Sequence, residues 1–151
     1  MSQENVDVVR RFEEAMVAAI DNESSGGEGD FASILALLDE ECVIHGAASL
    51  PHGAEQVGHA GFFKLGELFS ENWTFIEKPT FVYRDAGDVV LLHATFVLES
   101  RVSGKRVPVE MVELHTVKNG KIVDLMPYYR DTVPEAEAAG MCKIISRATE
   151  A

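Results

Sequence analysis

The residues with the clearest chemical potential lie in the run MVELHTV, which precedes the dipeptide Asn119-Gly120. Because side chains of a strand alternate between two faces, Glu113 shares one face with Met111 and His115. Burial of a carboxyl group disfavours its charged form and raises its pKa. We therefore predict that Glu113 is a neutral, catalytic hydrogen-bond donor. The alternative is that Glu113 faces solvent or pairs with a lysine.

Two further groups complete the candidate chemistry. His52 lies in the loop SLPHG, where an imidazole at the mouth of a pocket would titrate near neutrality and act as a catalytic base. An exposed loop residue with no role is the other interpretation. His115 is close enough along the strand to form a hydrogen-bonded pair with Glu113. Counting from the turn at Asn119-Gly120 favours Tyr129 over Tyr128 as the tyrosine that lines the same face.

Other kinds of chemistry find no support in the sequence. The five histidines lack the HxH or HExxH spacing of metal ligands, so we predict no metal. Neither a phosphate-binding glycine loop nor a dinucleotide fingerprint is present, so we predict no cofactor. Cys42 and Cys142 lie outside any CxxC motif and are expected to be free thiols.

Composition narrows the classes of partner. The chain has 151 residues and a formal charge of -12, which repels nucleic acid and anionic membranes. The N-terminus is polar and lacks the apolar region of a signal peptide, so we expect a soluble, cytoplasmic protein. The expected partners are a small apolar molecule and a second copy of the chain.

The elements that must position these residues can be read in chain order. Asn119-Gly120 is typical of a two-residue hairpin turn, and the flanking runs are rich in β-branched and aromatic residues. Val89–Ser100 is apolar on both faces, as a central strand is. The remaining expected elements are helices at 6–20, 31–38, 57–70 and 133–139, a strand at 42–46, and a strand at 73–83. Pro79 within this last strand indicates an edge position or a bulge.

Two of the helices carry start signals. Asp30 is a good N-cap for the helix expected from Phe31. Thr132 and Glu135 have the spacing of a capping box, in which each side chain bonds a backbone N–H at the start of the helix expected from Val133.

Three N-terminal helices followed by antiparallel strands predict an α+β fold. We expect one domain spanning 1–151, with a mobile loop at 21–29 and a C-terminal helix and tail at 132–151. A strongly curved sheet covered by helices forms a cone, which is packed at its base and able to hold a small molecule at its mouth.

The order of elements and three strings resemble the SnoaL-like branch of the nuclear transport factor 2-like superfamily. The strings are IHGAASLPHG, VGHAGFFKLGELF and VKNGKIVDLMPYYRDT, and the resemblance covers Asn5 to Thr132. It implies a cystatin-like α+β barrel with an interior pocket. Ketosteroid isomerase, limonene epoxide hydrolase and polyketide cyclases belong to this superfamily, whose members place catalytic groups freely around one pocket.

The motifs of these enzymes survive only in part. Gly46 stands where ketosteroid isomerase has its general base, and Met16 where it has a tyrosine donor. Glu113 matches its protonated acid. Limonene epoxide hydrolase has an Asp-Arg-Asp set whose positions match Ala94, Phe96 and Pro127. The expected substrate-binding residues are His115, Tyr129, Met111, Phe96, Phe62 and Met16.

Two functions follow with equal support. The first is a cofactor-free isomerase, cyclase or hydratase acting on a small carbonyl compound, with Glu113 and His52 as its catalytic pair. The second is a non-catalytic binding protein that keeps the pocket. In either case we expect a homodimer formed through the outer sheet face, which carries Val112 and Leu114.

Overall fold

The computed structural model describes residues 2–141, and the structural statements below concern that part of the chain. Its elements follow in the order α1 (Ser2–Ser24), α2 (Phe31–Leu35), β1 (Leu38–Ile44), β2 (Gln56–Val57), α3 (Gly58–Asn72), β3 (Trp73–Phe75), β4 (Thr80–Ala86), β5 (Val89–Ser100), β6 (Arg106–Lys118), β7 (Lys121–Tyr129) and α4 (Val133–Ala138).

The predicted hairpin is present as β6 and β7. Lys118 pairs with Lys121 across the turn, where Asn119 has φ 51° and Gly120 has φ 74°. Positive φ at both central residues is the conformation of a primed turn, which Asn and Gly adopt at little cost. The turn sets only the pairs beside it. Val117 pairs with Ile122 but Thr116 pairs with Asp124, so an irregularity at Val123 shifts the register of the remaining pairs by one residue.

The seven-stranded sheet has the order β2-β1-β7-β6-β5-β3, and β4 also pairs with β5. The strands from β3 onward pair antiparallel, whereas β1 runs parallel to β7. As predicted, β5 is central, since it lies between β6 and the two edge strands β3 and β4. The α+β fold class is confirmed, with a strongly curled half-barrel sheet.

Two predicted strands have different bounds. The strand expected at 73–83 is interrupted at 76–79, where Pro79 lacks the backbone N–H that a ladder needs. The strand expected from Cys42 begins at Leu38, because Leu38, Cys42 and Ile44 are buried on one side of β1 while its acidic residues stay partly or fully exposed. The second helix consequently ends earlier than predicted.

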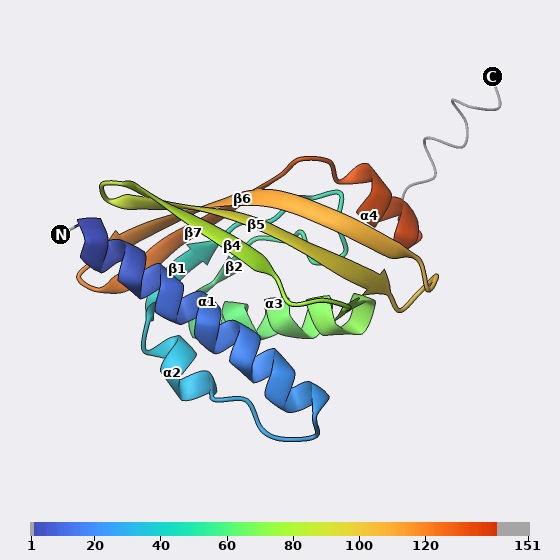
Figure 1. Cartoon of the computed structure of the whole chain (residues 1–151), viewed down its shortest axis with the longest axis horizontal. Coiled ribbons are helices and arrows are strands. Elements are labelled where there is room, and N and C mark those ends of the chain that lie inside the picture. The colour runs from blue at the N-terminus through green and yellow to red at the C-terminus, as the bar shows by residue number, and fades with distance from the viewer. Residues whose placement is uncertain (1, 142–151) are drawn as a thin grey trace.

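The helices cover one face of the sheet. In Figure 1, α1, α2 and α3 lie on the same side of the strands. Val9 and Phe12 of α1 belong to a core cluster that includes Ile34 of α2 and Phe62 of α3. We call the face that these helices cover the inner face and the opposite one the outer face. Asp30 caps α2 as predicted, accepting a hydrogen bond of 3.2 Å from the backbone N–H of Ser33.

The first and last helices depart from prediction in detail. Helix α1 continues to Ser24, so it takes up the first residues of the loop expected at 21–29. Helix α4 forms close to its predicted bounds, yet Thr132 makes no side-chain capping bond. The capping box expected between Thr132 and Glu135 is wrong, because the Glu135 side chain is buried instead.

Cys42 is a free thiol, as expected. Cys42 is fully buried and free, and burial raises the pKa of its thiol to about 12. It therefore stays protonated and unreactive at neutral pH. Cys142 lies outside the described residues. Within residues 2–141, no helix has both the length and the apolar character needed to cross a bilayer.

Candidate functional site

Glu113 lies on the inner face of β6, as its alternation predicts. Met111 and His115 on either side of it are buried on the same face, and Val112 and Leu114 point to the outer face. The Glu113 side chain keeps 17% exposure, whereas that of His115 has none. Glu113 is thus the more accessible of the two groups.

A second glutamate, absent from the candidates that the sequence indicates, joins this pair. His115 Nε2 lies 3.2 Å from Oε1 of Glu13 and 3.5 Å from Oε2 of Glu113. Glu13 comes from α1, where its charge suggests an outward face. Glu13 nevertheless lies four residues after Val9 and three before Met16, which is the spacing of the buried side of the helix. This spacing is the sequence signal that could have identified Glu13 as an inward-facing residue. We call Glu13, Glu113 and His115 the inner cluster.

Two groups of the inner cluster, Glu113 and His115, have pKa values above their ordinary values. Burial raises the pKa of Glu113 to about 7, with the negative charge of Glu13 acting in the same direction and His115 in the opposite one. Burial alone would lower the pKa of His115, but its hydrogen bond to Glu13 and the two nearby carboxylates outweigh burial and raise it. Near neutral pH Glu113 therefore exchanges between its acid and ionised forms, beside an imidazole whose charged form the two carboxyl groups favour.

The inner cluster also has the donors of a metal site. One ligand atom from each residue lies within 4.8 Å of the others. Short-spacing motifs cannot reveal this set, because its residues come from the separate elements α1 and β6. The expectation of no metal rests on sequence spacing alone and stays a prediction.

His52 is placed differently from our expectation. It is 5% exposed and its Nδ1 accepts a hydrogen bond of 3.3 Å from Trp73 Nε1. Because an indole N–H can only donate, the neutral His52 carries its proton on Nε2 and donates it to Tyr129 Oη at 3.3 Å. Burial lowers the pKa of His52 to about 4. The structure therefore contradicts the expectation that His52 lies exposed at the pocket mouth and titrates near neutral pH.

Tyr129 lies on the inner face together with Leu125 and Pro127, as predicted, while Tyr128 is 58% exposed on the outer face. Pro127 pairs with Glu113 and Tyr129 pairs with Met111, so Tyr129 and Glu113 are diagonal neighbours on one face. Burial, then the charges of Glu135 and Glu113, raise the pKa of Tyr129 well above its usual range. Tyr129 is a permanent hydroxyl donor.

The remaining predicted substrate-binding residues are dispersed over the same interior. Met111 and Phe62 are buried, at 6% and 7% exposure, and Phe62 packs edge-on against Phe12. Met16 and Phe96 are half-buried at the edges of the two core clusters. Whether any of them contacts a ligand stays a prediction.

Gly46 lies in a part of the loop after β1 that leaves no room for a side chain. A Cβ built on Gly46 would lie 2.6 Å from the backbone oxygen of Gly53. The loop folds back so closely that no side chain fits at Gly46 without moving backbone. A general base at this position is therefore excluded by sterics as well as by sequence.

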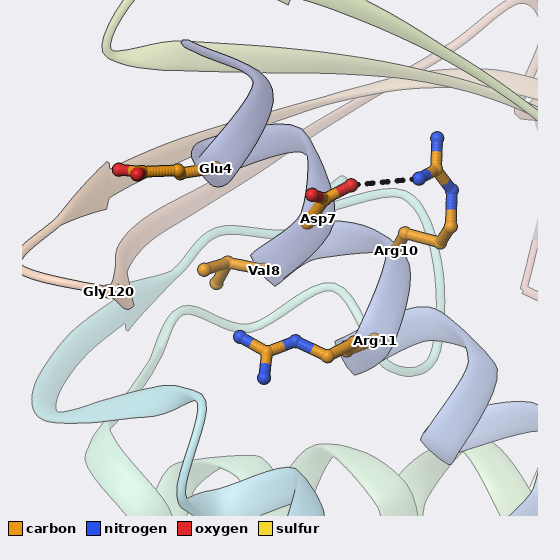
Figure 2. A pocket seen from close by; sticks show the side chains of 6 residues that line it. All are labelled: Glu4, Asp7, Val8, Arg10, Arg11 and Gly120. Carbon is orange, nitrogen blue, oxygen red and sulfur yellow. Dashed lines mark hydrogen bonds and ion pairs between the residues drawn. The ribbon is translucent and has the colours of Figure 1, made fainter. Parts of the chain in front are cut away.

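The surface carries two hollows away from this interior. One, of about 560 Å³, lies between the start of α1 and the β6–β7 turn, and is lined by Glu4, Asp7, Val8, Arg10, Arg11 and Gly120, as Figure 2 shows. The other, of about 360 Å³, borders Phe96, Glu110 and Arg130. Neither is lined by Glu113, so the interior pocket stays a prediction that rests on partly exposed inner side chains.

Solved structures of bacterial proteins share the fold. An NTF2-like protein from Burkholderia xenovorans is 26% identical with a TM-score of 0.73, covering 92% of this chain and 98% of that one. A Silicibacter protein with the provisional name polyketide cyclase is 16% identical, with a TM-score of 0.68 and coverage of 90% and 95%. A Rhodopseudomonas palustris protein with the provisional name isomerase is 15% identical, with a TM-score of 0.68 and coverage of 86% and 96%.

Among curated proteins, none matches this sequence. The family comparison is more specific than the structural one. A SnoaL-like domain model matches residues 9–125, a segment that contains Glu13, Gly46, Glu113 and His115. Because this match spans more than half of the chain, and the fold agrees with it, the protein belongs to the SnoaL-like domain family.

Proposed function

We propose that this protein is a cofactor-free acid–base enzyme that acts on a small, largely apolar carbonyl compound, as an isomerase or cyclase does. One observation carries the proposal: Glu113, with a pKa of about 7, is the member of the inner cluster with the most exposed side chain. A catalytic group works best when its pKa lies near the working pH. The provisional names of two similar structures, cyclase and isomerase, agree with this class.

The roles follow from accessibility. In its ionised form Glu113 takes a proton from the carbon beside the carbonyl, and in its acid form it returns that proton to a second carbon. One carboxyl group thus moves a proton without a net gain or loss of charge. His115 is fully buried and reaches the substrate only through Glu113, so it is a positioning residue rather than a substrate contact. Glu13 holds the His115 proton through its hydrogen bond.

The role of His52 in this proposal differs from the catalytic base expected from the sequence. Its two ring nitrogens are engaged by Trp73 and Tyr129, and its low pKa leaves it neutral at pH 7. It orients the Tyr129 hydroxyl instead of serving as the base.

Proton exchange tests the proposal with generic carbonyl compounds. Acetophenone and cyclohex-2-enone are incubated with the protein in deuterated water, and loss of the α-proton signal is followed by NMR. We expect protein-dependent exchange that falls at least about 100-fold in Glu113→Gln, the usual contribution of a general base. The matched control is Glu110→Gln, since Glu110 lies on the outer face of the same strand.

Binding without exchange would support the second function, a binding protein that lacks catalysis. The blocked position at Gly46 and the engaged nitrogens of His52 favour this alternative. Exchange at equal rates in the wild type and in Glu113→Gln would remove Glu113 from the reaction.

We also propose that the protein is a homodimer. The outer face of β6 presents Val112 and Leu114, which are only half-buried within one chain. Leu91 and Met126 pair with Leu114 on either side, so the apolar surface extends over three strands. A second copy placed on this face would remove that surface from water.

A further inference from the structure

Glu135 is a buried carboxyl group that the proposed reaction does not use. It is 1% exposed, and neither of its oxygens has a hydrogen-bond partner among residues 2–141. A buried polar group without a partner destabilises the folded state. Burial, helped by the charge of Asp131, raises the pKa of Glu135 to about 7. A helix that only closed the fold would be more stable with an apolar residue here.

The position of Glu135 is fixed by its helix. The carbonyl oxygen of Ala138, near the end of α4, accepts hydrogen bonds from Ser100 Oγ at 2.8 Å and from Ser103 Oγ at 2.7 Å. Ala136 and Ala138 are buried, and Ala138 packs in the cluster that contains Trp73 and Met111. Figure 1 shows α4 at the far end of the sheet from the N-terminus. The anchoring holds Glu135 toward the interior.

The Tyr129 hydroxyl group is an unused hydrogen-bond donor on the same side of the interior as Glu135. Its hydroxyl oxygen already accepts the Nε2 proton of His52, and Trp73 fixes the tautomer that makes this possible. The hydroxyl hydrogen of Tyr129 has no acceptor within the described part of the chain. Glu135 and Glu113 are the carboxyl groups that act electrostatically on Tyr129. Tyr129 also packs against the buried cluster that contains Ala138, which lies three residues after Glu135 on the same helix. A donor and an acceptor, each without a partner among the described residues, therefore lie on the same side of the interior.

We propose that Tyr129 and Glu135 bind a hydroxyl group of the ligand. The ligand oxygen accepts from Tyr129 Oη, and the ligand hydrogen is donated to a carboxyl oxygen of Glu135, so each unpaired group gains a partner. This inference rests on the proposed function, in which Glu113 acts at the carbonyl end. Since Glu113 and Tyr129 are diagonal neighbours, the substrate class is a small carbonyl compound with a hydroxyl group several bonds away.

A matched pair of probes tests the site. Binding of acetophenone and of 4-hydroxyacetophenone is measured by NMR titration of the isotope-labelled protein. One added hydrogen-bonded group should tighten binding of the hydroxylated probe by about fivefold in the wild type. The gain should disappear in Glu135→Leu and in Tyr129→Phe. It should persist in Glu137→Gln, because Glu137 lies exposed on the same helix.

Two further readouts separate this site from a purely structural role. The ¹³C signal of the Glu135 carboxyl should move with 4-hydroxyacetophenone and not with acetophenone. Urea denaturation midpoints establish whether each variant is folded. If Glu135→Leu is unfolded, Glu135→Gln replaces it, because glutamine preserves the shape of the side chain.

The outcomes are distinct from those of the exchange test. Exchange of acetophenone that depends on Glu113, together with no gain from the added hydroxyl group, would overturn the Tyr129–Glu135 site and leave the proposed function intact. A gain that survives Glu135→Leu, or a failure of both probes to bind the wild type, would also overturn it. A gain lost in both variants, without any exchange, would support the site and contradict the proposed function.

Discussion

Replacing Glu113 by glutamine should stabilise the protein at pH 8 and change its stability little at pH 4. The ordinary pKa of this carboxyl is 4.5 and burial raises it to about 7 in the folded state. The folded state therefore binds the proton more tightly than the unfolded state does, and stability is lost as pH rises between these values. Glutamine keeps the shape and cannot ionise.

The magnitude follows from the same two values. A pKa difference between 4.5 and about 7 corresponds to about 3 kcal/mol of unfolding free energy, lost almost fully by pH 8. The 17% exposure of the side chain is small enough for most of this difference to remain. Loss of the contact with His115 acts against it, so the change between pH 4 and pH 8 is more informative than either value alone.

Urea denaturation of both proteins at the two pH values measures the effect. Glu110→Gln is the control on the same strand, because Glu110 pairs with Arg130 and its pKa is lowered rather than raised. That variant should gain no stability at pH 8. A Glu113→Gln protein that is less stable than the wild type at pH 8 would mean that Glu113 is ionised and paired, which contradicts its assignment as a proton donor.

Three other predictions follow from single features. His52 should show no titration in NMR spectra between pH 5.5 and 7.5, since burial lowers its pKa to about 4, and a midpoint inside that range would contradict its buried placement. Gly46→Ala should lower the unfolding free energy by about 1 to 3 kcal/mol, because its Cβ would overlap the backbone of Gly53; an unchanged melting temperature would show that the loop yields. Sedimentation should show a dimer for the wild type and a monomer for the double variant Val112→Glu, Leu114→Glu. A wild-type monomer at micromolar concentration would count against the outer-face interface.

Much of the fold follows from local signals in the sequence. Asn119-Gly120 predicts the hairpin, and alternation along β6 is enough to place Glu113 on the same face as Met111 and His115. Regular counting across the turn would pair Met111 with Tyr128, and the register shift at Val123 pairs it with Tyr129 instead. Pro79 likewise indicates an edge position or a bulge, whereas the full break at 76–79 is not predicted. The predicted bounds fail where tertiary packing decides, as at Leu38, which pairs with Ile122 of β7 far along the chain.

The site is less predictable, because it joins elements that are distant in sequence. Glu13 and His115 are 102 residues apart, and only helical spacing in α1 hints that Glu13 turns inward. His52 belongs to a loop whose composition suggests exposure, and nothing local reveals that Trp73 and Tyr129 enclose it. Glu135 has the spacing of a capping motif, which predicts a side chain at the surface rather than a buried one.

The proposed chemistry depends on an exchangeable proton that Glu113 holds near neutral pH. A pH titration of the glutamate side-chain carboxyl carbons by ¹³C NMR measures this directly, with Glu113→Gln used to assign the signal. We predict a resonance that is absent from the variant and titrates with a midpoint of about 7. A Glu113 signal with its midpoint at or below the ordinary value of 4.5 would contradict the proposed role.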